Sequence, residues 1–351
     1  MTAPWDSGKV FVIAEAGSNW RQGSAARDLR MARTLIDVAA EAGADAVKFQ
    51  TYRPETLYAV GAGSSDYLAA AGVREPISDI LADLAMPYEM IPELAEHARA
   101  CGLLFLSTPF SPRDFAEVDP FVAVHKIASY EISHLRLIEL AGRSGKPLVL
   151  STGASTEEDV SWAIETFRAN GGRSVCLMQC TARYPAPPES LNLRAIPGLA
   201  GRFGVPVGLS DHSRDPVLAP VAAVGLGARA IEKHYTLSNR LPGPDHAFAV
   251  TAAELAAMVR AIRETESALG TGRKEVLPEE AELASYARRG LQALRDIAPG
   301  DTLREGVNVD ALRPGKRRPG IHPRALPLLE GKRARRAIPA GDGILDGDFG
   351  D

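Results

Sequence analysis

The sequence predicts a (β/α)8 TIM barrel, an α/β architecture, followed by a small β-rich domain. Short apolar runs alternate with amphipathic helical patterns, as expected for strands that alternate with helices. The runs are apolar almost throughout, which is typical of parallel strands buried on both faces. Eight such units in about 270 residues match the size of a barrel of this kind. A doubly wound sheet is the alternative, but the first turn reads AEAGSNW and lacks the pattern G-x-G-x-x-G.

Eight candidate strands follow one another along the chain. They lie at residues 9–17, 46–52, 103–110, 124–131, 147–153, 175–180, 205–210 and 228–235. Helical patterns lie between and after them. Residues 24–42 carry one apolar stripe and end at Gly43, which suits a helix C-terminus. Residues 252–269 repeat this pattern and are followed by Gly270.

Three segments fall outside the repeating units. Residues 53–87 form a long insertion after the second strand, on the side where barrel active sites lie. We expect this insertion to hold residues that recognise the substrate. Residues 271–287 are polar and are interpreted as a linker between a barrel domain at 1–270 and a tail domain at 288–351. Within the tail, GLQALRDIAPGDTL and RARRAIPAGDGIL share a short strand pattern followed by a Gly-Asp turn, which indicates an internal repeat.

Composition indicates an ordinary globular protein. The chain has 351 residues, of which 45% are hydrophobic and 24% charged, and its formal net charge is −4. This charge predicts no general attraction to nucleic acid or to a membrane surface. No apolar stretch approaches the roughly 20 residues of a membrane span. The N-terminus lacks a signal-peptide pattern, so we expect a cytoplasmic protein.

Charge and cysteine content carry two further expectations. Residues 285–351 contain 13 Lys and Arg against 9 Asp and Glu, whereas the first 284 residues have a net charge of −8. A basic tail and an acidic body predict that the two parts face each other. The chain has three cysteines, too few and too scattered for a disulfide framework. Cys176 and Cys180 lie in an apolar run and are expected to be core thiols.

Polar side chains gather where the candidate strands end. In a barrel these ends converge on one face, and catalytic residues come from several strands there. Any one of these residues alone would also suit a structural ion pair. Buried Lys and Glu are rare, however, so the whole set on one face predicts an active site. The set comprises Glu15, Lys48, Gln50, Thr108, Lys126, Ser129, Glu131, Ser151, Tyr184, Ser210, His212, Lys233 and His234.

Two histidines in this set suggest a metal site. His212 and His234 end adjacent strands, so their imidazoles can reach one divalent ion such as Mn, Fe, Co or Zn. The alternative is that each is an ordinary hydrogen-bonded side chain. Asp245, in the loop RLPGPDH, is expected to project over the barrel mouth or else to serve only as a turn residue.

Cations and hydroxyl groups in the same set suggest an anion site. Lys126, Ser129, Ser151 and Ser210 together would suit a phosphate group. Lys48 and Lys126 would alternatively suit a Schiff-base aldolase. The neighbouring histidine pair disfavours this alternative, because a metal and a Schiff base are two different ways to activate a carbonyl.

These motifs together resemble the sialic acid synthase family, which makes N-acetylneuraminate, legionaminate and pseudaminate. The resemblance covers almost the whole chain, and the tail resembles the antifreeze-like SAF domain that ends these enzymes. The matching segments, in order, are IAEAGSNW, DAVKFQTY, STPF, KIASYE, STGAS, QCTARYPAP, GLSDHS, AIEKHYTL, GPDH and LRPG. The resemblance implies a transferase that condenses phosphoenolpyruvate with an N-acylated amino-sugar aldehyde to a nine-carbon 2-keto sugar acid and phosphate, by C–O cleavage. It also implies a divalent metal, with Mn²⁺ expected and Mg²⁺ or Co²⁺ as alternatives.

The resemblance assigns a role to most of these residues. It implies that His212 and His234 bind the metal and that Glu131 lies near the attacking water. Glu15 matches an active-site carboxylate of unassigned role, and Lys48 and Lys126 match catalytic lysines of the phosphoenolpyruvate pocket. The rest of that pocket matches Thr108, Ser129, Ser151 and Ser210. Sugar contacts match Gln50, Tyr184, Asp245 and Arg313.

The chain departs from the family pattern at two places. Ala182 stands where many relatives carry Asn or Ser, which removes one polar contact near the phosphate. The turn RPGKRRPG is longer than the turn in the family pattern, so Arg317 and Arg318 are alternatives to Arg313. We expect a domain-swapped homodimer in which this arginine completes the active site of the partner subunit. The competing functions are a synthase that uses a phosphorylated sugar to make a 3-deoxy-ulosonate and a non-catalytic carbohydrate-binding protein.

Overall fold

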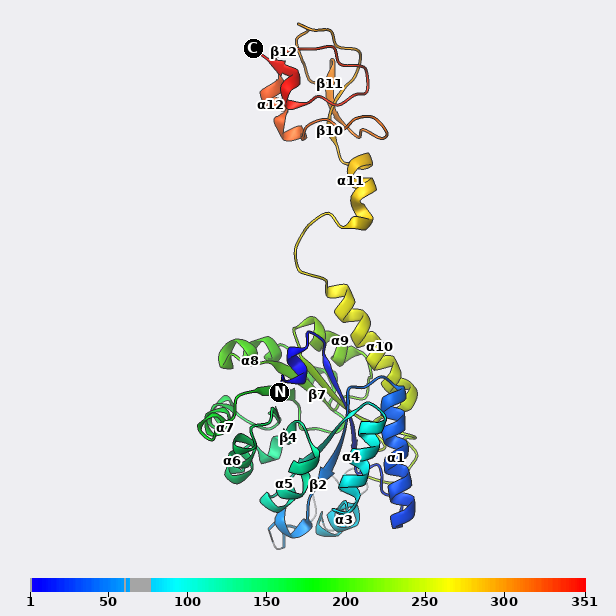
Figure 1. Ribbon diagram of the computed structural model, residues 1–351, viewed down its shortest axis with the longest axis vertical. Coiled ribbons are helices and arrows are strands. Elements are labelled where there is room, and N and C mark those ends of the chain that lie inside the picture. Colours follow the sequence, from blue (N-terminus) through cyan, green and yellow to red (C-terminus); the bar gives the residue numbers. More distant parts are fainter. Residues whose placement is uncertain (1, 60, 64–76) are drawn as a thin grey trace. The chain divides into compact units, whose positions relative to one another are not determined.

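Eight parallel strands form a nearly closed barrel in the first part of the chain (Figure 1). The computed structural model describes residues 2–59, 61–63 and 77–351. It divides into two compact units, Met1–Gly270 and Thr271–Asp351. The hydrogen-bonded strand order is β3-β2-β1-β8-β7-β6-β5-β4, and a short strand β9 (Val250–Thr251) pairs with β8. The barrel strands are β1 (Phe11–Gly17), β2 (Ala46–Thr51), β3 (Leu104–Pro109), β4 (His125–Ile127), β5 (Leu148–Ser151), β6 (Val175–Cys180), β7 (Val207–Asp211) and β8 (Ala230–Thr236).

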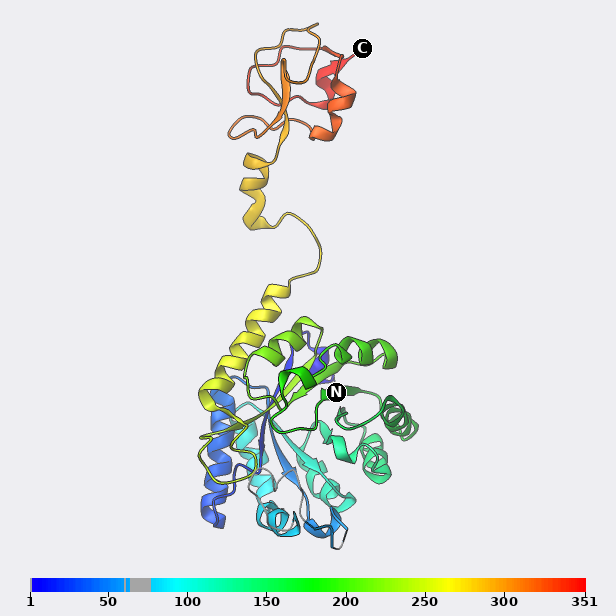
Figure 2. The same ribbon diagram turned by 180° about the vertical axis from the view of Figure 1, so that it is seen from behind.

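Helices surround the barrel on its outside, as Figures 1 and 2 show from opposite sides. The sequence predicted the eight strands and the two longest helices, α1 and α10, and these predictions are confirmed. Of the insertion at 53–87, residues 60 and 64–76 lie outside the described part of the chain. The described helices of this unit are α1 (Ala25–Glu41), α3 (Ile77–Leu84), α4 (Met90–Ala100), α5 (Pro112–Val118), α6 (Leu135–Ser144), α7 (Glu157–Ala169), α8 (Ala195–Phe203), α9 (Leu218–Gly225) and α10 (Ala252–Leu269).

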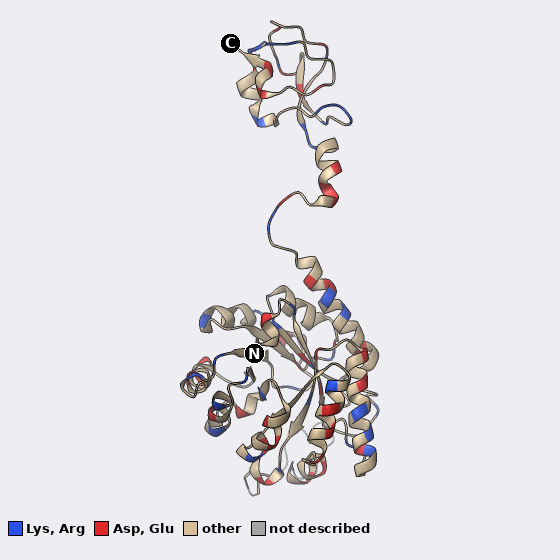
Figure 3. Ribbon diagram, viewed as in Figure 1, with Lys and Arg blue, Asp and Glu red and all other residues tan. Residues whose placement is uncertain are grey.

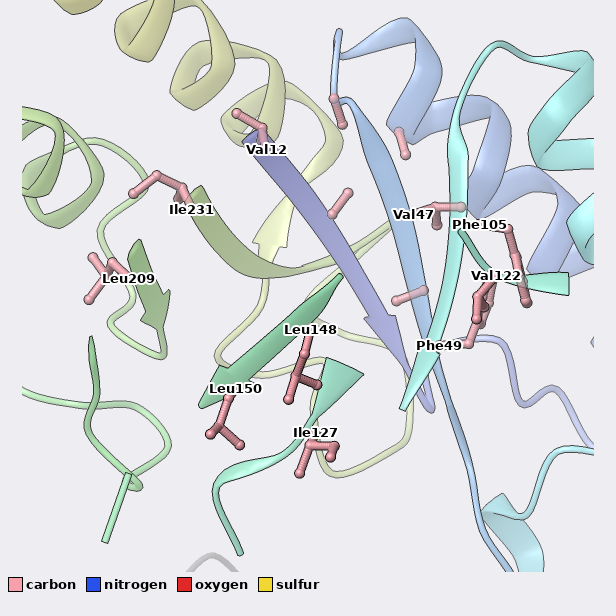
Figure 4. Close-up of a cluster of buried hydrophobic side chains, with 14 of the residues drawn as sticks. Val12, Val47, Phe49, Phe105, Val122, Ile127, Leu148, Leu150, Leu209 and Ile231 are labelled. Atoms are coloured by element: carbon pink, nitrogen blue, oxygen red, sulfur yellow. The ribbon is translucent and has the colours of Figure 1, made fainter. Parts of the chain in front are cut away.

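Successive side chains of each barrel strand alternate between two cores. The larger core lies between the strands and the helices, and Figure 4 shows members such as Val12, Val47 and Ile231. The smaller core fills the barrel interior near the start of the strands, where Trp5 of the N-terminal segment packs with Phe11 and Ile13 of β1. The inward-facing residues near the start of each strand therefore form an apolar core. The inward-facing residues nearer the strand ends lie outside this core and can be polar.

The second unit is built from the predicted internal repeat. Its strands are β10 (Gly290–Ala293), β11 (Val309–Leu312), β12 (Arg333–Ala334) and β13 (Phe349–Gly350). β10 pairs with β11, and β12 pairs with β13, both antiparallel. The two repeats pair reciprocally, because Ile297 and Ile338 exchange both backbone hydrogen bonds at 2.9 Å. Helix α12 (Leu326–Leu329) covers the core beside them, and α11 (Ala281–Ala287) lies within the segment interpreted as a linker.

Among the helices of the described residues, none has the length and apolarity needed to cross a bilayer.

Candidate active site

The polar residues of the strand ends face inward above the smaller core. The alternation that points Ile13 into the barrel also points Glu15 inward, and Glu15 lies level with Lys48 of β2 and with His234 of β8. Eleven predicted site residues line a single pocket. They are Glu15, Lys48, Gln50, Thr108, Lys126, Ser129, Ser151, Tyr184, Ser210, His212 and His234.

Two lysines and two glutamates form a buried charged cluster at the base of this pocket. Lys48 Nζ lies 2.7 Å from Glu15 Oε2 and 3.7 Å from Glu232 Oε1. Lys126 Nζ lies 3.5 Å from the other Glu232 oxygen, Oε2. Lys48 also donates a hydrogen bond to Thr108 Oγ1 at 3.2 Å. The carboxylates hold both lysines in place and offset their charges in the absence of a bound anion.

Glu232 belongs to this cluster but was missing from the predicted site. It is 4% exposed and lies between the two lysines. The sequence contained a signal for it, because Glu232 precedes His234 by two residues and must face the same side of β8. The same rule turns Lys233 outward, so the expectation that Lys233 joins the site was wrong. Its Nζ lies 2.5 Å from Asp211 Oδ2 in a buried ion pair.

Burial shifts the ionisation of several groups here. It raises the pKa of Glu15 to about 7, although Lys48 acts against this. It also raises the pKa of Glu131 to about 7, with Lys126 again opposing the shift. Burial lowers the pKa of Lys126, and Glu232 only partly reverses this effect. Glu15 lines the pocket, whereas Glu131 is not among its lining residues. A carboxyl group with a pKa near neutrality is suited to exchanging protons with a substrate.

Hydroxyl groups line another part of the pocket. Ser129 Oγ accepts a hydrogen bond from the backbone N–H of Gly153 at 2.9 Å. A Cβ at Gly153 would lie 2.9 Å from both Ser129 Oγ and Cys180 Sγ, so only glycine allows this close approach. Ser151 Oγ is buried and has no hydrogen-bond partner among the described residues. An unsatisfied buried hydroxyl that lines a pocket indicates a polar ligand.

Cys180 was expected to be a core thiol, but it lies at the wall of the pocket. It is buried, as a core thiol would be, but its Sγ lines the pocket. It lies 3.5 Å from Ser129 Oγ and 3.8 Å from His212 Nδ1. Cys176, by contrast, lies in the barrel interior core as expected.

The two histidines meet at one side of the pocket. The ring centroids of His212 and His234 are 5.5 Å apart. His212 Nδ1 lies 2.9 Å from the carbonyl oxygen of Thr181, which leaves Nε2 for another partner. His234 Nδ1 lies 3.6 Å from Asp245 Oδ2 and has no hydrogen-bond partner among the described residues. Two imidazoles with an orienting carbonyl and a nearby carboxylate have the chemistry of a divalent metal site.

Asp245, Gln50 and Tyr184 surround the histidines. Ser18 Oγ donates to Asp245 Oδ2 at 3.5 Å, and a Cβ at Gly17 would lie 2.7 Å from that oxygen. Gln50 Nε2 donates to Glu15 Oε1 at 2.9 Å. The Tyr184 ring lies 4.1 Å from the His212 ring, centroid to centroid. Asp245 therefore lies beside the barrel mouth and contacts it through Ser18 and His234.

Arg313 belongs to the other unit, where it is exposed. It follows β11 directly and starts the predicted arginine-rich turn. Arg318 in this turn donates to the carbonyl oxygen of Gly343 at 3.4 Å, and Arg317 packs near Gly341. Both alternatives to Arg313 thus lie against their own unit.

Comparison with known proteins follows the same division of the chain. The NeuB family model matches residues 35–274, and the SAF domain model matches residues 288–350. The Bacillus subtilis spore coat polysaccharide biosynthesis protein SpsE is 42% identical over 358 residues, covering 97% of this chain and 93% of that protein. Pseudaminic acid synthase of Campylobacter jejuni is 37% identical over 344 residues, covering 97% of each chain. The crystal structure of N-acetylneuraminic acid synthetase from Leptospira borgpetersenii has a TM-score of 0.69 at 31% identity, covering 79% of this chain and 91% of that one.

Proposed function

The chain belongs to the NeuB family, and we propose that it condenses phosphoenolpyruvate with an N-acylated amino-sugar aldehyde to a nine-carbon 2-keto sugar acid. The candidate sugars are N-acetylmannosamine and diacetamido-trideoxyhexoses. One observation carries the proposal: two buried lysines and a wall of serine hydroxyls adjoin a histidine pair at the strand ends. The first group suits an enol phosphate, and the second suits a metal that receives an aldehyde.

Phosphoenolpyruvate is proposed to bind over Lys48 and Lys126. The phosphate would contact Ser129, Ser151 and Ser210, and the unsatisfied Ser151 hydroxyl supports this assignment. Because burial raises the pKa of Glu15 to about 7, this carboxyl can take up a proton when the anion arrives. A protonated Glu15 would leave the lysine charges free to attract the substrate. Held in this way, carbon 3 is positioned for attack, and positioning supplies much of the rate.

A divalent ion, with Mn²⁺ favoured over Mg²⁺ or Co²⁺, is proposed to be held by His212 and His234. The donor set fits such an ion, since the Thr181 carbonyl fixes the tautomer of one imidazole and Asp245 faces the other. When bound, the ion would polarise the aldehyde oxygen as a Lewis acid. Asp245, Gln50 and Tyr184 are proposed to orient the sugar beside it.

The bond changes follow from the electron demand of the enol. Its double bond attacks the aldehyde carbon, which forms the new C–C bond and leaves positive charge on carbon 2. Water adds to carbon 2 and gives one proton to Glu131, and an equivalent proton ends on the former aldehyde oxygen. The hydroxyl now on carbon 2 passes its remaining proton to the phosphate, which leaves with its bridging oxygen, so the keto oxygen comes from water. Glu131 is suited to this step because it is 8% exposed and its Oε2 has no hydrogen-bond partner among the described residues.

The experiment that tests this function measures phosphate release. The purified protein, with phosphoenolpyruvate and Mn²⁺, is assayed against a panel of free amino sugars and sugar phosphates. We expect phosphate release with one or more N-acylated amino sugars and a product whose mass equals phosphoenolpyruvate plus sugar plus water minus phosphate. Turnover with a sugar phosphate alone would indicate a 3-deoxy-ulosonate synthase instead, and no turnover would favour a binding protein.

The Glu131→Gln variant is expected to lose the acidic limb of the pH–rate profile. Glu131 must be unprotonated to accept a proton from water, so the wild-type rate falls as the pH drops below about 7. The amide cannot act as a base, and kcat should fall by roughly 10²–10⁴. Steady-state kinetics from pH 5 to 9 measure both effects. If the limb survives unchanged in Glu131→Gln, Glu15 is the titrating group and Glu131 is not the base.

We propose that the chain acts in the cytoplasm as a domain-swapped homodimer built from a barrel domain (1–270), a linker (271–287) and an SAF domain (288–351). The net charge of +4 on residues 285–351 and of −8 on the rest supports an attraction between tail and barrel. Arg313, Arg317 and Arg318 are all exposed, but Arg318 also donates a hydrogen bond within its own unit. Arg313 of the partner subunit is therefore the candidate that reaches the sugar, where its planar fork suits hydroxyl or acyl oxygens.

Mixing two inactive variants tests this assembly. An Arg313→Ala chain and a Lys126→Ala chain are each expected to be nearly inactive. After subunit exchange, one site of each heterodimer receives both intact groups, so activity should return to about half per heterodimer because one of its two sites is intact. The matched control mixes Arg324→Ala with Lys126→Ala. It shows how mixing and subunit exchange by themselves affect the measured rate. Exchange demonstrated by mass spectrometry without recovered activity would mean that Arg313 serves its own barrel or no site.

A further inference from the structure

A cluster of metal-type donors lies on the outside of the barrel, apart from the pocket. It consists of Asp37 in α1 and of His97 and Cys101 at the end of α4, and their ligand atoms all lie within 4.8 Å of one another. His97 and Cys101 are four residues apart, which places them on one face of the helix and its cap. We propose that Asp37, His97 and Cys101 form a peripheral site for a zinc-class divalent ion that joins α1 to α4.

The distances suit one ion with three protein ligands. His97 Nε2 lies 2.7 Å from Asp37 Oδ1, and Cys101 Sγ lies 3.6 Å from that oxygen and 3.9 Å from Nε2. Ligand atoms bound at about 2.0–2.3 Å in a tetrahedron lie roughly 3.3–3.8 Å apart. The two sulfur distances nearly match this spacing already. The shorter distance is a hydrogen bond, and it would lengthen slightly when an ion replaces the proton.

The donor types select the ion. A thiolate, an imidazole and a carboxylate together favour Zn²⁺ or its analogue Co²⁺ over Mg²⁺ or Ca²⁺, which prefer oxygen ligands. The side chains of His97 and Asp37 are 27% and 49% exposed, so an ion from solvent can reach them.

The position of the cluster separates it from the active site. α1 ends four residues before β2 begins, and α4 ends three residues before β3 begins. The cluster therefore lies beside the starts of these strands, whereas the pocket lies beyond their ends. Catalytic groups of such barrels occur at the strand ends, and the opposite face serves stability. The partial negative charge at two helix C-termini also favours a cation here.

The two helices already meet through polar pairs on the same seam. One turn before the cluster, Arg33 Nη2 lies 2.5 Å from Glu93 Oε1. Figure 3 shows that both helices carry acidic and basic residues along their length. An ion between Asp37 and His97 would extend this seam and stabilise the barrel without touching the reaction.

Titration of the whole protein with Co²⁺ tests the site. We expect a thiolate-to-cobalt charge-transfer band that saturates at one ion per chain and is absent in Cys101→Ser. His97→Gln and Asp37→Asn should weaken binding at least tenfold. The matched control, Glu93→Gln, breaks the neighbouring ion pair but removes no donor, so the band should remain.

Two further measurements test whether the band arises at the active site and whether Cys101→Ser is folded. The band should persist in the His212→Ala/His234→Ala variant, and Zn²⁺ should raise the Tm of the wild type but not of Cys101→Ser. Cys101→Ser should retain Mn²⁺-supported turnover, which shows that it folds. The proposal is overturned if the wild type gives no band, or if the band survives Cys101→Ser and disappears in the double histidine variant.

Discussion

Replacing His212 and His234 together by alanine is expected to abolish turnover. The two imidazoles are the nitrogen donors that meet at one side of the pocket, with ring centroids 5.5 Å apart. A Lewis acid at an aldehyde oxygen contributes several kcal/mol to the reaction, so loss of about 4 kcal/mol lowers the rate roughly a thousandfold. Chelator treatment of the wild type should have the same effect, and added Mn²⁺ should restore the wild type only.

The control for this experiment is His322→Ala. His322 is exposed in the second unit, and its loss should leave both turnover and metal dependence unchanged. Thermal melts of all variants establish that they are folded. Wild-type turnover by the chelated double variant would show that the histidines do not support the reaction through a metal.

Lys126→Met is expected to raise KM for phosphoenolpyruvate and lower kcat/KM at least about 100-fold. Methionine keeps the length of the buried stem but removes the charge that faces Glu232 at 3.5 Å. Removing one partner of a buried, hydrogen-bonded charge pair costs about 2–5 kcal/mol, and about 3 kcal/mol corresponds to this factor. Initial rates over a range of phosphoenolpyruvate concentrations measure the change.

Lys233→Met provides the contrast. Lys233 is also a buried lysine of the barrel, but it pairs with Asp211 outside the pocket. Its loss should lower the free energy of unfolding by about 3–5 kcal/mol, because a buried carboxylate loses its partner. The KM of its folded fraction for phosphoenolpyruvate should change little. Equal effects of both variants on KM would argue that Lys126 acts only through stability.

The barrel was predictable from two features of the sequence that indicate the same fold. These are the regular alternation of strands and helices and the change from apolar to polar residues along the strands. Nearly every strand begins apolar and ends polar on its inward side, as Ile13 and Glu15 of β1 illustrate. The internal repeat of the tail was equally visible, since its two copies pair through Ile297 and Ile338. Such short-range periodicities are written directly into the sequence.

Side-chain direction was harder to predict than strand position. Adjacent residues of a strand face opposite sides. A side chain one position along the strand from a pocket residue therefore points to the outside of the barrel. This explains why Glu232 was overlooked and Lys233 was wrongly included, although they are neighbours. Cys180 was misjudged because it lies in an apolar run. An apolar sequence alone does not show whether a buried residue belongs to the core or lines the pocket.

Phosphoenolpyruvate labelled with oxygen-18 at the bridging position tests the central claim most directly. In the proposed reaction, attack by carbon 3 leaves carbon 2 to receive water, and the C–O bond to phosphate breaks. Mass spectrometry should therefore find the label in the released phosphate, and the new keto oxygen should come from solvent. Label retained in the sugar acid would mean P–O cleavage and would contradict the proposed roles of Glu131 and of the strand-end pocket.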